Sequence, residues 1–294
     1  MPLKDLLLAL VVIVAWGLNF VVIKVGLDGL PPMLLGGLRF ALVAIPAVFF
    51  IRRPQLPLRW LLAYGLTISF GQFAFLFEAM GNGMPPGLAS LVLQSQAFFT
   101  MIFAAVFLGE RLRAASVLGL LVAAGGLALI GSENGGHVPL LALVLTLGGG
   151  ACWAMGNIIT RRFGNIDLMA LVIWGALVPP LPFFAMSWYL EGPALIETSL
   201  RNIGMSSILS LVYLALIATM LGYGLWSRLL SRYPAGKVAP FSLLVPVVGL
   251  SSSAVLLDER LSAIQCWGGL LVMVGLLINV FGPRLKARFL PARA

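Results

Sequence analysis

Apolar segments long enough to cross a lipid bilayer follow one another along almost the whole of this 294-residue chain. About 20 apolar residues in an α-helix span a hydrocarbon core of about 30 Å, and the helix satisfies every backbone polar group internally. Hydrophobic residues make up 61% of the sequence and charged residues only 10%, far from the composition of a soluble domain. We therefore predict an all-α integral membrane protein with ten transmembrane helices. These lie near residues 4–26, 31–51, 58–79, 86–108, 113–131, 139–160, 167–189, 204–230, 236–257 and 263–283.

The basic residues are distributed by side of the membrane. The net charge is +9, yet lysines and arginines form no tract with interleaved aromatic residues, so we expect no nucleic-acid partner. Most of the 19 lie at the amino terminus, in every second loop and at the carboxyl terminus, whereas the opposite side carries only Lys24, Arg201 and Arg260. Because loops rich in lysine and arginine stay in the cytoplasm, both termini are predicted to be cytoplasmic.

Cysteine chemistry contributes little. The two cysteines, Cys152 and Cys266, both fall inside predicted membrane helices, so no disulfide framework is implied and we interpret them as packing residues.

A short charged motif occurs twice, as LGERL at 108–112 and LDERL at 257–261. Shifting the chain by 149 positions aligns the two copies, and it also aligns Tyr64 with Tyr213, Pro85 with Pro234, Gly87 with Gly236, Gly119 with Gly268 and Gly126 with Gly275. We therefore predict two halves of five helices, 1–135 and 136–294.

Because five is an odd number, the second half would enter the membrane from the side opposite to the first. The halves are thus predicted to be inverted repeats, an architecture typical of carriers whose substrate site lies near the bilayer midplane. Inversion also explains why Arg113 follows the first motif, on the cytoplasmic side, while Ser262 follows the second, outside.

The ten segments, the two halves, Trp16-x-x-Asn19, Arg39 in the second segment and the GERL and DERL motifs together resemble the EamA-type branch of the drug/metabolite transporter superfamily. Within that branch the pattern looks most like the YddG-type bacterial exporters of aromatic amino acids, and the resemblance covers essentially the full length. It implies a bacterial-type inner (plasma) membrane protein that works by alternating access, with the fifth and tenth segments packed away from the substrate pathway.

Polar and aromatic side chains near the middle of the segments are the candidates for substrate contact, because polar groups at that depth need a partner or a wet cavity. The predicted substrate-binding residues are Trp16, Asn19, Gln72, Gln96, Phe98, Trp153, Asn157, Tyr223 and Ser252. The pairs Trp16/Asn19 and Trp153/Asn157 each share one helix face and are related by the repeat, so we expect them to face one another. Packing between helices is the alternative for each of these residues.

Two further positions carry alternatives. Gln94 and Gln96 would point about 200° apart on an α-helix, so at most one should face a cavity, and Gln96 is preferred. Arg39 is the embedded formal charge: its guanidinium could bind a substrate carboxylate or could brace the carbonyls of helix ends. We prefer the structural role, because the second segment is not among those that present faces rich in aromatic residues.

The energy source is approached by exclusion. The sequence has no G-x-x-x-x-G-K-[ST] motif, so direct use of ATP is not expected. Acidic residues lie at segment ends or in loops, as does His137, and Glu78 is the nearest candidate for ion coupling. We therefore expect uncoupled facilitated export, with no cofactor and no metal.

The protein is expected to lie in the lipid bilayer, and a site rich in aromatic rings and amides favours a small amphipathic substrate. The resemblance favours aromatic or neutral amino acids within that class. The alternatives are a proton-coupled exporter of a different substrate, and a channel or scaffold. An intramembrane enzyme is disfavoured, since the sequence has neither an H-E-x-x-H motif nor a serine with a histidine in reach.

Overall fold

The computed structural model describes residues 1–132, 138–163 and 166–289, so His137 lies outside the described residues. Over these ranges every regular element is helical, as the sequence predicts. In chain order the elements are α1 (Leu3–Leu27), α2 (Pro32–Ala47), α3 (Leu58–Tyr64), η1 (Gly65–Gly71), α4 (Gln72–Gly81), α5 (Pro86–Val92), η2 (Leu93–Ser95), α6 (Gln96–Leu108), α7 (Ala114–Gly131), α8 (Leu140–Phe163), α9 (Leu168–Gly175), α10 (Pro180–Met186), η3 (Ser187–Glu191), α11 (Pro193–Arg201), α12 (Met205–Val212), η4 (Tyr213–Leu221), α13 (Gly222–Arg232), α14 (Ala235–Val238), η5 (Ala239–Leu244), α15 (Val245–Leu256) and α16 (Ala263–Phe289).

Within the described ranges, nine helical segments are long and apolar enough to cross a membrane. They are Leu3–Leu27, Leu58–Gly81, Pro86–Leu108, Ala114–Gly131, Leu140–Phe163, Leu168–Glu191, Met205–Arg232, Ala239–Leu256 and Ala263–Gly282. The predicted segment 31–51 is represented by α2, an apolar helix of 16 residues that ends at Ala47, just after Pro46. Its role as a tenth span stays a prediction.

Five of the long segments change their helical winding along their length, and in one of them, Leu168–Glu191, the change is a π-helical end at Ser187–Glu191. In the other four, Gly65–Gly71 and Tyr213–Leu221 are wound as π-helix, and Leu93–Ser95 and Ala239–Leu244 as 3-10 helix. The 149-position shift places each of these two π-helical stretches on the other, and each 3-10 stretch on the other. Such changes inside a helix are frequent at functional sites and hinges, because they redirect side chains and free backbone groups.

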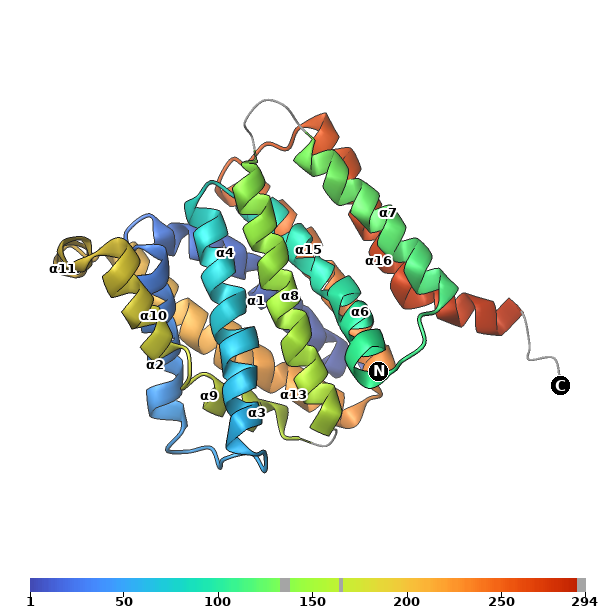
Figure 1. The fold of residues 1–294 in the computed structure, drawn as a ribbon, viewed down its shortest axis with the longest axis horizontal. Helices are drawn as coiled ribbons and strands as arrows, with labels where there is room; N and C mark the ends of the chain where they lie inside the picture. Colours follow the sequence, from blue (N-terminus) through green and yellow to red (C-terminus); the bar gives the residue numbers. More distant parts are fainter. Residues whose placement is uncertain (133–137, 164–165, 290–294) are drawn as a thin grey trace.

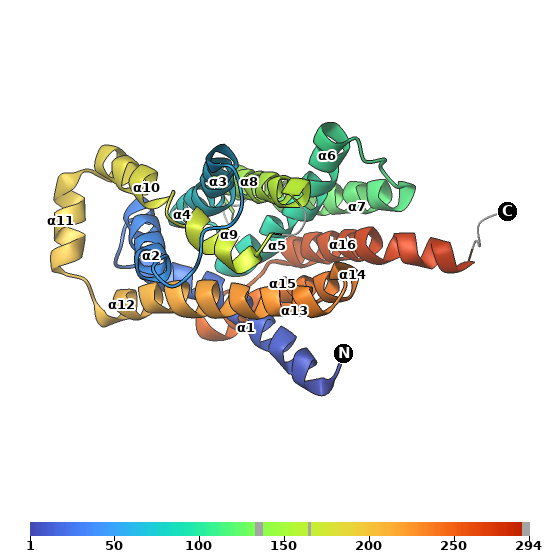
Figure 2. The ribbon, with the colours of Figure 1, turned by 90° about the horizontal axis from the view of Figure 1, so that it is seen from below.

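The helices α7 and α16 lie side by side at one edge of the molecule (Figures 1 and 2). Their backbones approach closely through glycines. A Cβ on Gly119 would lie 2.5 Å from the Gly275 carbonyl oxygen, and one on Gly126 would lie 2.5 Å from the Gly268 carbonyl oxygen. Since Gly119 meets the later glycine and Gly126 the earlier one, the helices are antiparallel, and larger side chains would force them apart.

The segment Leu168–Glu191 is broken between α9 and α10, where Ala176–Pro179 lie outside regular helix. Proline at the start of α10 fits such a break, because a ring without an N–H is tolerated in a first turn. The short helix α11, which the sequence analysis did not predict, then leads across to α12 at one end of the molecule (Figure 2).

Candidate functional site

A cavity of about 360 Å³ lies among the helices that carry the predicted site residues. Residues from α1, α2, α8 and α9 contribute to its wall, together with the four segments that contain η1, η2, η4 and η5, so these four changes in winding lie at the cavity. None of its lining residues comes from α7 or α16. The lining residues are Trp16, Asn19, Phe20, Arg39, Tyr64, Ile68, Gln72, Phe73, Leu76, Ser90, Leu93, Gln94, Gln96, Trp153, Asn157, Thr160, Leu168, Ala218, Tyr223, Trp226, Leu230, Ala239, Ser242 and Val245.

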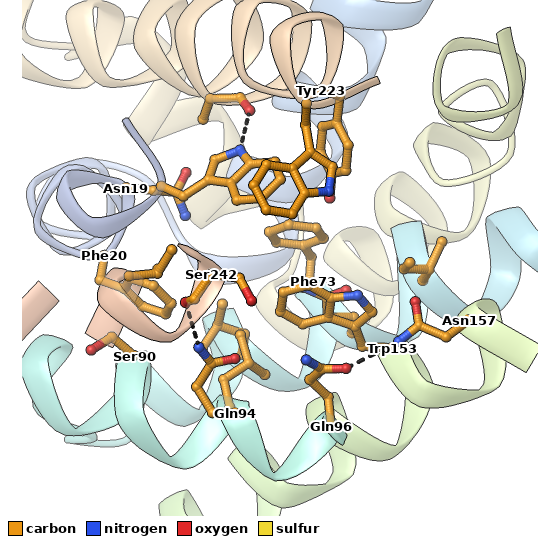
Figure 3. Close-up of a pocket in the computed structure, with 18 of the residues that line it drawn as sticks. Asn19, Phe20, Phe73, Ser90, Gln94, Gln96, Trp153, Asn157, Tyr223 and Ser242 are labelled. Carbon is orange, nitrogen blue, oxygen red and sulfur yellow. Dashed lines mark hydrogen bonds between the residues drawn. The ribbon is translucent and has the colours of Figure 1, made fainter. Parts of the chain in front are cut away.

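Most of the predicted substrate-binding residues are brought together here: Trp16, Asn19, Gln72, Gln96, Trp153, Asn157 and Tyr223 line the cavity, and so does Arg39. Asn19 and Asn157, which belong to the two pairs related by the repeat, lie on opposite sides of it (Figure 3).

Three predicted residues lie elsewhere. Phe98 is only 3% exposed and packs in the hydrophobic core. The hydroxyl of Ser252 donates to the Gly249 carbonyl of its own helix at 3.1 Å, and Ser242, ten positions earlier, lines the cavity in its place. Glu78 accepts a hydrogen bond from Asn82 at 2.9 Å, near the end of α4, and is not among the lining residues.

The expectation that only one of Gln94 and Gln96 could face the cavity was wrong, because both line it (Figure 3). The 3-10 turn Leu93–Ser95 explains the difference. With three residues per turn, two positions advance the side chain by about 240° rather than about 200°, so the two directions separate by about 120° instead of about 160°.

Gln94 reaches across to the second half of the chain. Its Nε2 donates to the carbonyl of Ser242 at 3.1 Å. That carbonyl already accepts the Val245 N–H of the 3-10 turn, but Pro246 has no N–H to offer it. The second lone pair of this carbonyl therefore has no competing backbone donor from position 246 and accepts the Gln94 amide instead.

Hydrogen bonds orient other groups of the wall. Asn157 Nδ2 donates to Gln96 Oε1 at 3.0 Å and to Thr100 Oγ1 at 3.1 Å. Trp16 Nε1 donates to the Ala218 carbonyl in the second π-helical stretch at 3.0 Å. All three hydrogen bonds connect different helices, so they set the shape of the cavity as well as its polarity.

Two side-chain acceptors of the cavity wall have no partner among the described residues: Asn19 Oδ1 and Gln72 Oε1 are buried and accept no hydrogen bond. Buried amide oxygens normally accept a hydrogen bond, so an amide oxygen without a donor in a cavity wall could accept one from a ligand or a water.

Aromatic rings form one side of the site. The ring centroids of Trp16 and Tyr223 lie 5.2 Å apart, and those of Trp16 and Trp226 lie 5.3 Å apart, at tilted angles. Such a cluster offers ring faces and edges to an apolar or aromatic ligand group.

Arg39 is 2% exposed, and its guanidinium lies over the Phe73 ring with Cζ 4.0 Å from the centroid. Its Nη2 donates a long hydrogen bond of 3.4 Å to the Thr219 hydroxyl, and not to the helix-end carbonyls that the structural role would use.

Sequence reasoning missed Tyr64, Phe73, Ser90, Thr160 and Ser242 as lining residues. Two of them carried a usable signal. Tyr64 aligns with Tyr213 in the repeat, and Thr160 follows Asn157 by three positions on one helix face. Ser90 and Ser242 had none, because small hydroxyl residues are common in membrane helices as packing groups.

Comparison with known proteins places this chain. The model of the EamA-like transporter family matches twice, over residues 3–132 and 140–281. Over 292 residues the chain is 55% identical to the probable amino-acid metabolite efflux pump of Escherichia coli (strain K12), covering 97% of this chain and 98% of that protein, and equally to the pump of the same description in Salmonella typhimurium.

More distant proteins agree over the full length. The chain is 27% identical to the probable terminal-alkyne amino-acid exporter of Streptantibioticus cattleyicolor, over 95% of this chain and 94% of that one. A crystal structure with 22% identity superposes with a TM-score of 0.64, covering 98% of this chain and 99% of the other, which shows a shared fold. The chain is therefore a multi-pass membrane protein that belongs to the EamA-like transporter family.

Proposed function

We propose that this protein exports small amphipathic amino-acid metabolites, with aromatic and neutral amino acids as the leading class. The observation that carries the proposal is the cavity of about 360 Å³, in which aromatic rings and unpartnered amide oxygens converge. Its size lies in the usual range of small-molecule sites, about 300–1,000 Å³. Relatives named as amino-acid metabolite efflux pumps support the substrate class.

The proposed mechanism is alternating access between two inverted halves, 1–135 and 136–294. Reciprocal packing supports it. Gly119 packs against Gly275, the repeat equivalent of Gly126, and Gly126 packs against Gly268, the repeat equivalent of Gly119. A two-fold axis between α7 and α16 would require this pattern. The matching π-helical and 3-10 stretches also support equivalent halves. Broken helices at the junction of repeats are typical of transporter sites.

The proposed topology has ten spans, with the short helix α2 as the tenth. Its 16 residues rise about 24 Å, less than the hydrocarbon core. Phe49 and Phe50 follow it and are 81% and 87% exposed, so lipid contact would extend the apolar stretch beyond the helix end. Ten spans and the loop charges favour cytoplasmic termini in a bacterial-type inner membrane.

We further propose that transport needs no coupled ion. Among the residues that the structure describes, those that line the cavity include no carboxylate and no histidine, and Glu78 accepts a hydrogen bond from Asn82 outside the lining. Intramembrane acids or histidines are the usual proton carriers, so their distance from this cavity supports facilitated diffusion.

Flux into reconstituted liposomes tests the function. Labelled L-phenylalanine and L-serine should show saturable uptake and counterflow. We expect Asn19→Ala and Trp153→Ala to reduce the flux at normal expression, while Leu121→Ala, on the exposed face of α7, leaves it unchanged. Conductance without saturation would instead indicate a channel, and normal flux in both site variants would remove these residues from the site.

An imposed pH gradient tests the energy source in the same liposomes. Under the proposal, labelled substrate equilibrates but does not accumulate. Uphill accumulation that is lost in Glu78→Gln would show a proton-coupled exporter.

A further inference from the structure

The environment of Arg39 differs from that of the other arginines described here. Its guanidinium carbon lies 4.0 Å from the Phe73 ring centroid, 5.3 Å from that of Phe40 and 6.0 Å from that of Phe77. The rings attract the guanidinium by cation–π interaction, and its N–H groups, which lie along its edge, need other partners for hydrogen bonds.

That edge is almost unused. Among the described residues Nε and Nη1 of Arg39 have no hydrogen-bond partner, and Nη2 makes only the 3.4 Å contact with Thr219. Because Nη2 carries two hydrogens, both the Nε/Nη2 side and the Nη1/Nη2 side of the fork keep unused N–H groups. Carboxylates bind such a fork with two parallel, charge-assisted hydrogen bonds.

Arg39 is also the charged residue of the cavity wall. None of the ion pairs in the described part of the chain includes it, and the lining residues include no acid that could neutralise it. A buried charge without a counter-charge is strongly unfavourable. The cavity is therefore electrostatically suited to a ligand that brings a negative group, and unsuited to one whose only charge is positive.

The same wall offers acceptors for a positive group. Asn19 Oδ1 and Gln72 Oε1 are buried and unpartnered, and Gln72 is the sequence neighbour of the ring on which Arg39 lies. Donors at Arg39 and acceptors at the two amides together match a zwitterion. The Trp16, Tyr223 and Trp226 rings remain for a side chain.

We infer that Arg39 determines substrate specificity: it binds the free carboxylate of the exported molecule, so this protein selects zwitterionic α-amino acids and excludes cations that lack a carboxylate. This inference rests on the proposed export function and assigns the chemical group by which the site recognises its substrate. Arg39 is then a ligand-binding residue rather than a brace between helices.

The test compares molecules that differ in the carboxylate. Wild-type protein in liposomes takes up labelled L-phenylalanine in competition with unlabelled L-phenylalanine, its N-acetyl derivative, which keeps the carboxylate, and its carboxamide, which keeps only the ammonium. We expect the carboxamide to compete about tenfold to a hundredfold more weakly than the amino acid, as for loss of a hydrogen-bonded charged group. Competition by the N-acetyl derivative should be clearly stronger than that by the carboxamide.

Variants separate binding from structure. Arg39→Gln should lose the preference for acid over carboxamide while still carrying the carboxamide, and Arg39→Lys, which keeps the charge without the fork, should retain part of it. Arg201→Gln, an exposed arginine of α11, is the matched control and should retain all of it. A brace between helices would instead lower the flux of both molecules and leave their ratio unchanged, which would overturn the inference.

A measurement on the wild type keeps the inference testable if Arg39→Gln fails to fold. The amino acid should raise the thermal unfolding temperature of the purified protein, and the carboxamide should not. Equal stabilisation or equal competition by the two, alongside saturable amino-acid flux, would refute the role of Arg39 and leave the export function standing. Absence of saturable flux for any amino acid in the panel would refute the export function itself.

Discussion

The two copies of the charged motif, residues 108–113 and 257–262, have the same backbone turn but different contacts. Gly109 and Asp258 occupy equivalent positions, and both are left-handed, with φ of 68° and 52°. Glycine adopts this conformation without penalty, and aspartate is among the few other residues that tolerate it. The turn is thus a common feature of both copies, whatever residue supplies it.

The glutamates of the two copies are used differently. Glu110 pairs with Arg161 at 3.2 Å, and both side chains are about half exposed, at 54% and 50%. Glu259 instead accepts the backbone N–H of the buried Gly87 at 2.9 Å, at the start of α5. One carboxylate makes an ion pair that water screens, whereas the other satisfies a buried donor at the start of another helix.

The residues after the motifs differ for a second reason. Ser262 and Gln265 form a capping box at the start of α16: Gln265 N donates to Ser262 Oγ, and Ser262 N donates to Gln265 Oε1, both at 3.1 Å. Arg113 at the start of α7 makes no such cap. The comparison teaches that one copy is specialised for loop charge and the other for local hydrogen bonding, on the same backbone.

The largest expected difference between the two motifs is the side of the membrane on which each lies. Single cysteines replacing Arg111 and Arg260, in a background with Cys152 and Cys266 changed to alanine, should be labelled from opposite sides of the membrane by an impermeant reagent. Lys4→Cys should behave like position 111, because both are proposed to be cytoplasmic. Labelling of 111 and 260 from one side would contradict inversion.

Glu259→Ala should give the largest loss of stability among substitutions in the motifs. It leaves the Gly87 N–H unsatisfied, at a cost of about 1–3 kcal/mol. Thermal or denaturant unfolding of the purified protein measures the change. Glu110→Ala is the matched control, and equal losses in the two variants would refute the difference between the copies.

Ser262→Ala should cost about 1 kcal/mol, because it removes the cap of α16. Ser262→Arg, which makes the second copy like the first, should cost a similar amount, and Ser262→Thr should restore the cap. Unfolding free energies of the three variants measure this. If the threonine variant is as unstable as alanine, capping is not the function of this serine.

Exchange of the turn residues should have a smaller effect of opposite sign in the two copies. Asp258→Gly removes the strain of a non-glycine residue in the left-handed conformation and should stabilise the folded protein by about 0.5–1 kcal/mol. Gly109→Asp should destabilise it by no more than that. Measured side by side, effects of the same sign would show that the two turns are not equivalent.

Glu110→Ala should have the smallest effect, about 0–1 kcal/mol, since exposed ion pairs contribute little. Raising the salt concentration to about 1 M shortens the screening length to about 3 Å and should abolish the difference from wild type. The loss in Glu259→Ala should persist at that salt concentration, because its cap is to a buried group.

The sequence identified residues that line the cavity where depth and helix face decided their position, while their role in binding substrate stays a prediction. Trp16, Asn19, Trp153 and Asn157 were selected by depth and helix face, and regular helices place them at one cavity. Prediction failed at changes of winding. Gln94 was not selected because a regular α-helix would direct its side chain away from the cavity. The 3-10 turn at 93–95 directs it toward the cavity instead. Ser252 was chosen by depth, yet its hydroxyl bonds to its own helix.

The sequence by itself determined that the chain is helical and membrane-embedded, because apolar segments of this length have few other ways to satisfy their backbone. It also determined the correspondence between the halves, since identities in register survive in a linear alignment. Only the tertiary structure decided which polar groups are left without a partner. Whether Arg39, Asn19 Oδ1 and Gln72 Oε1 find hydrogen-bond partners depends on which distant helices pack beside them. The spacing of residues along one helix does not determine that packing.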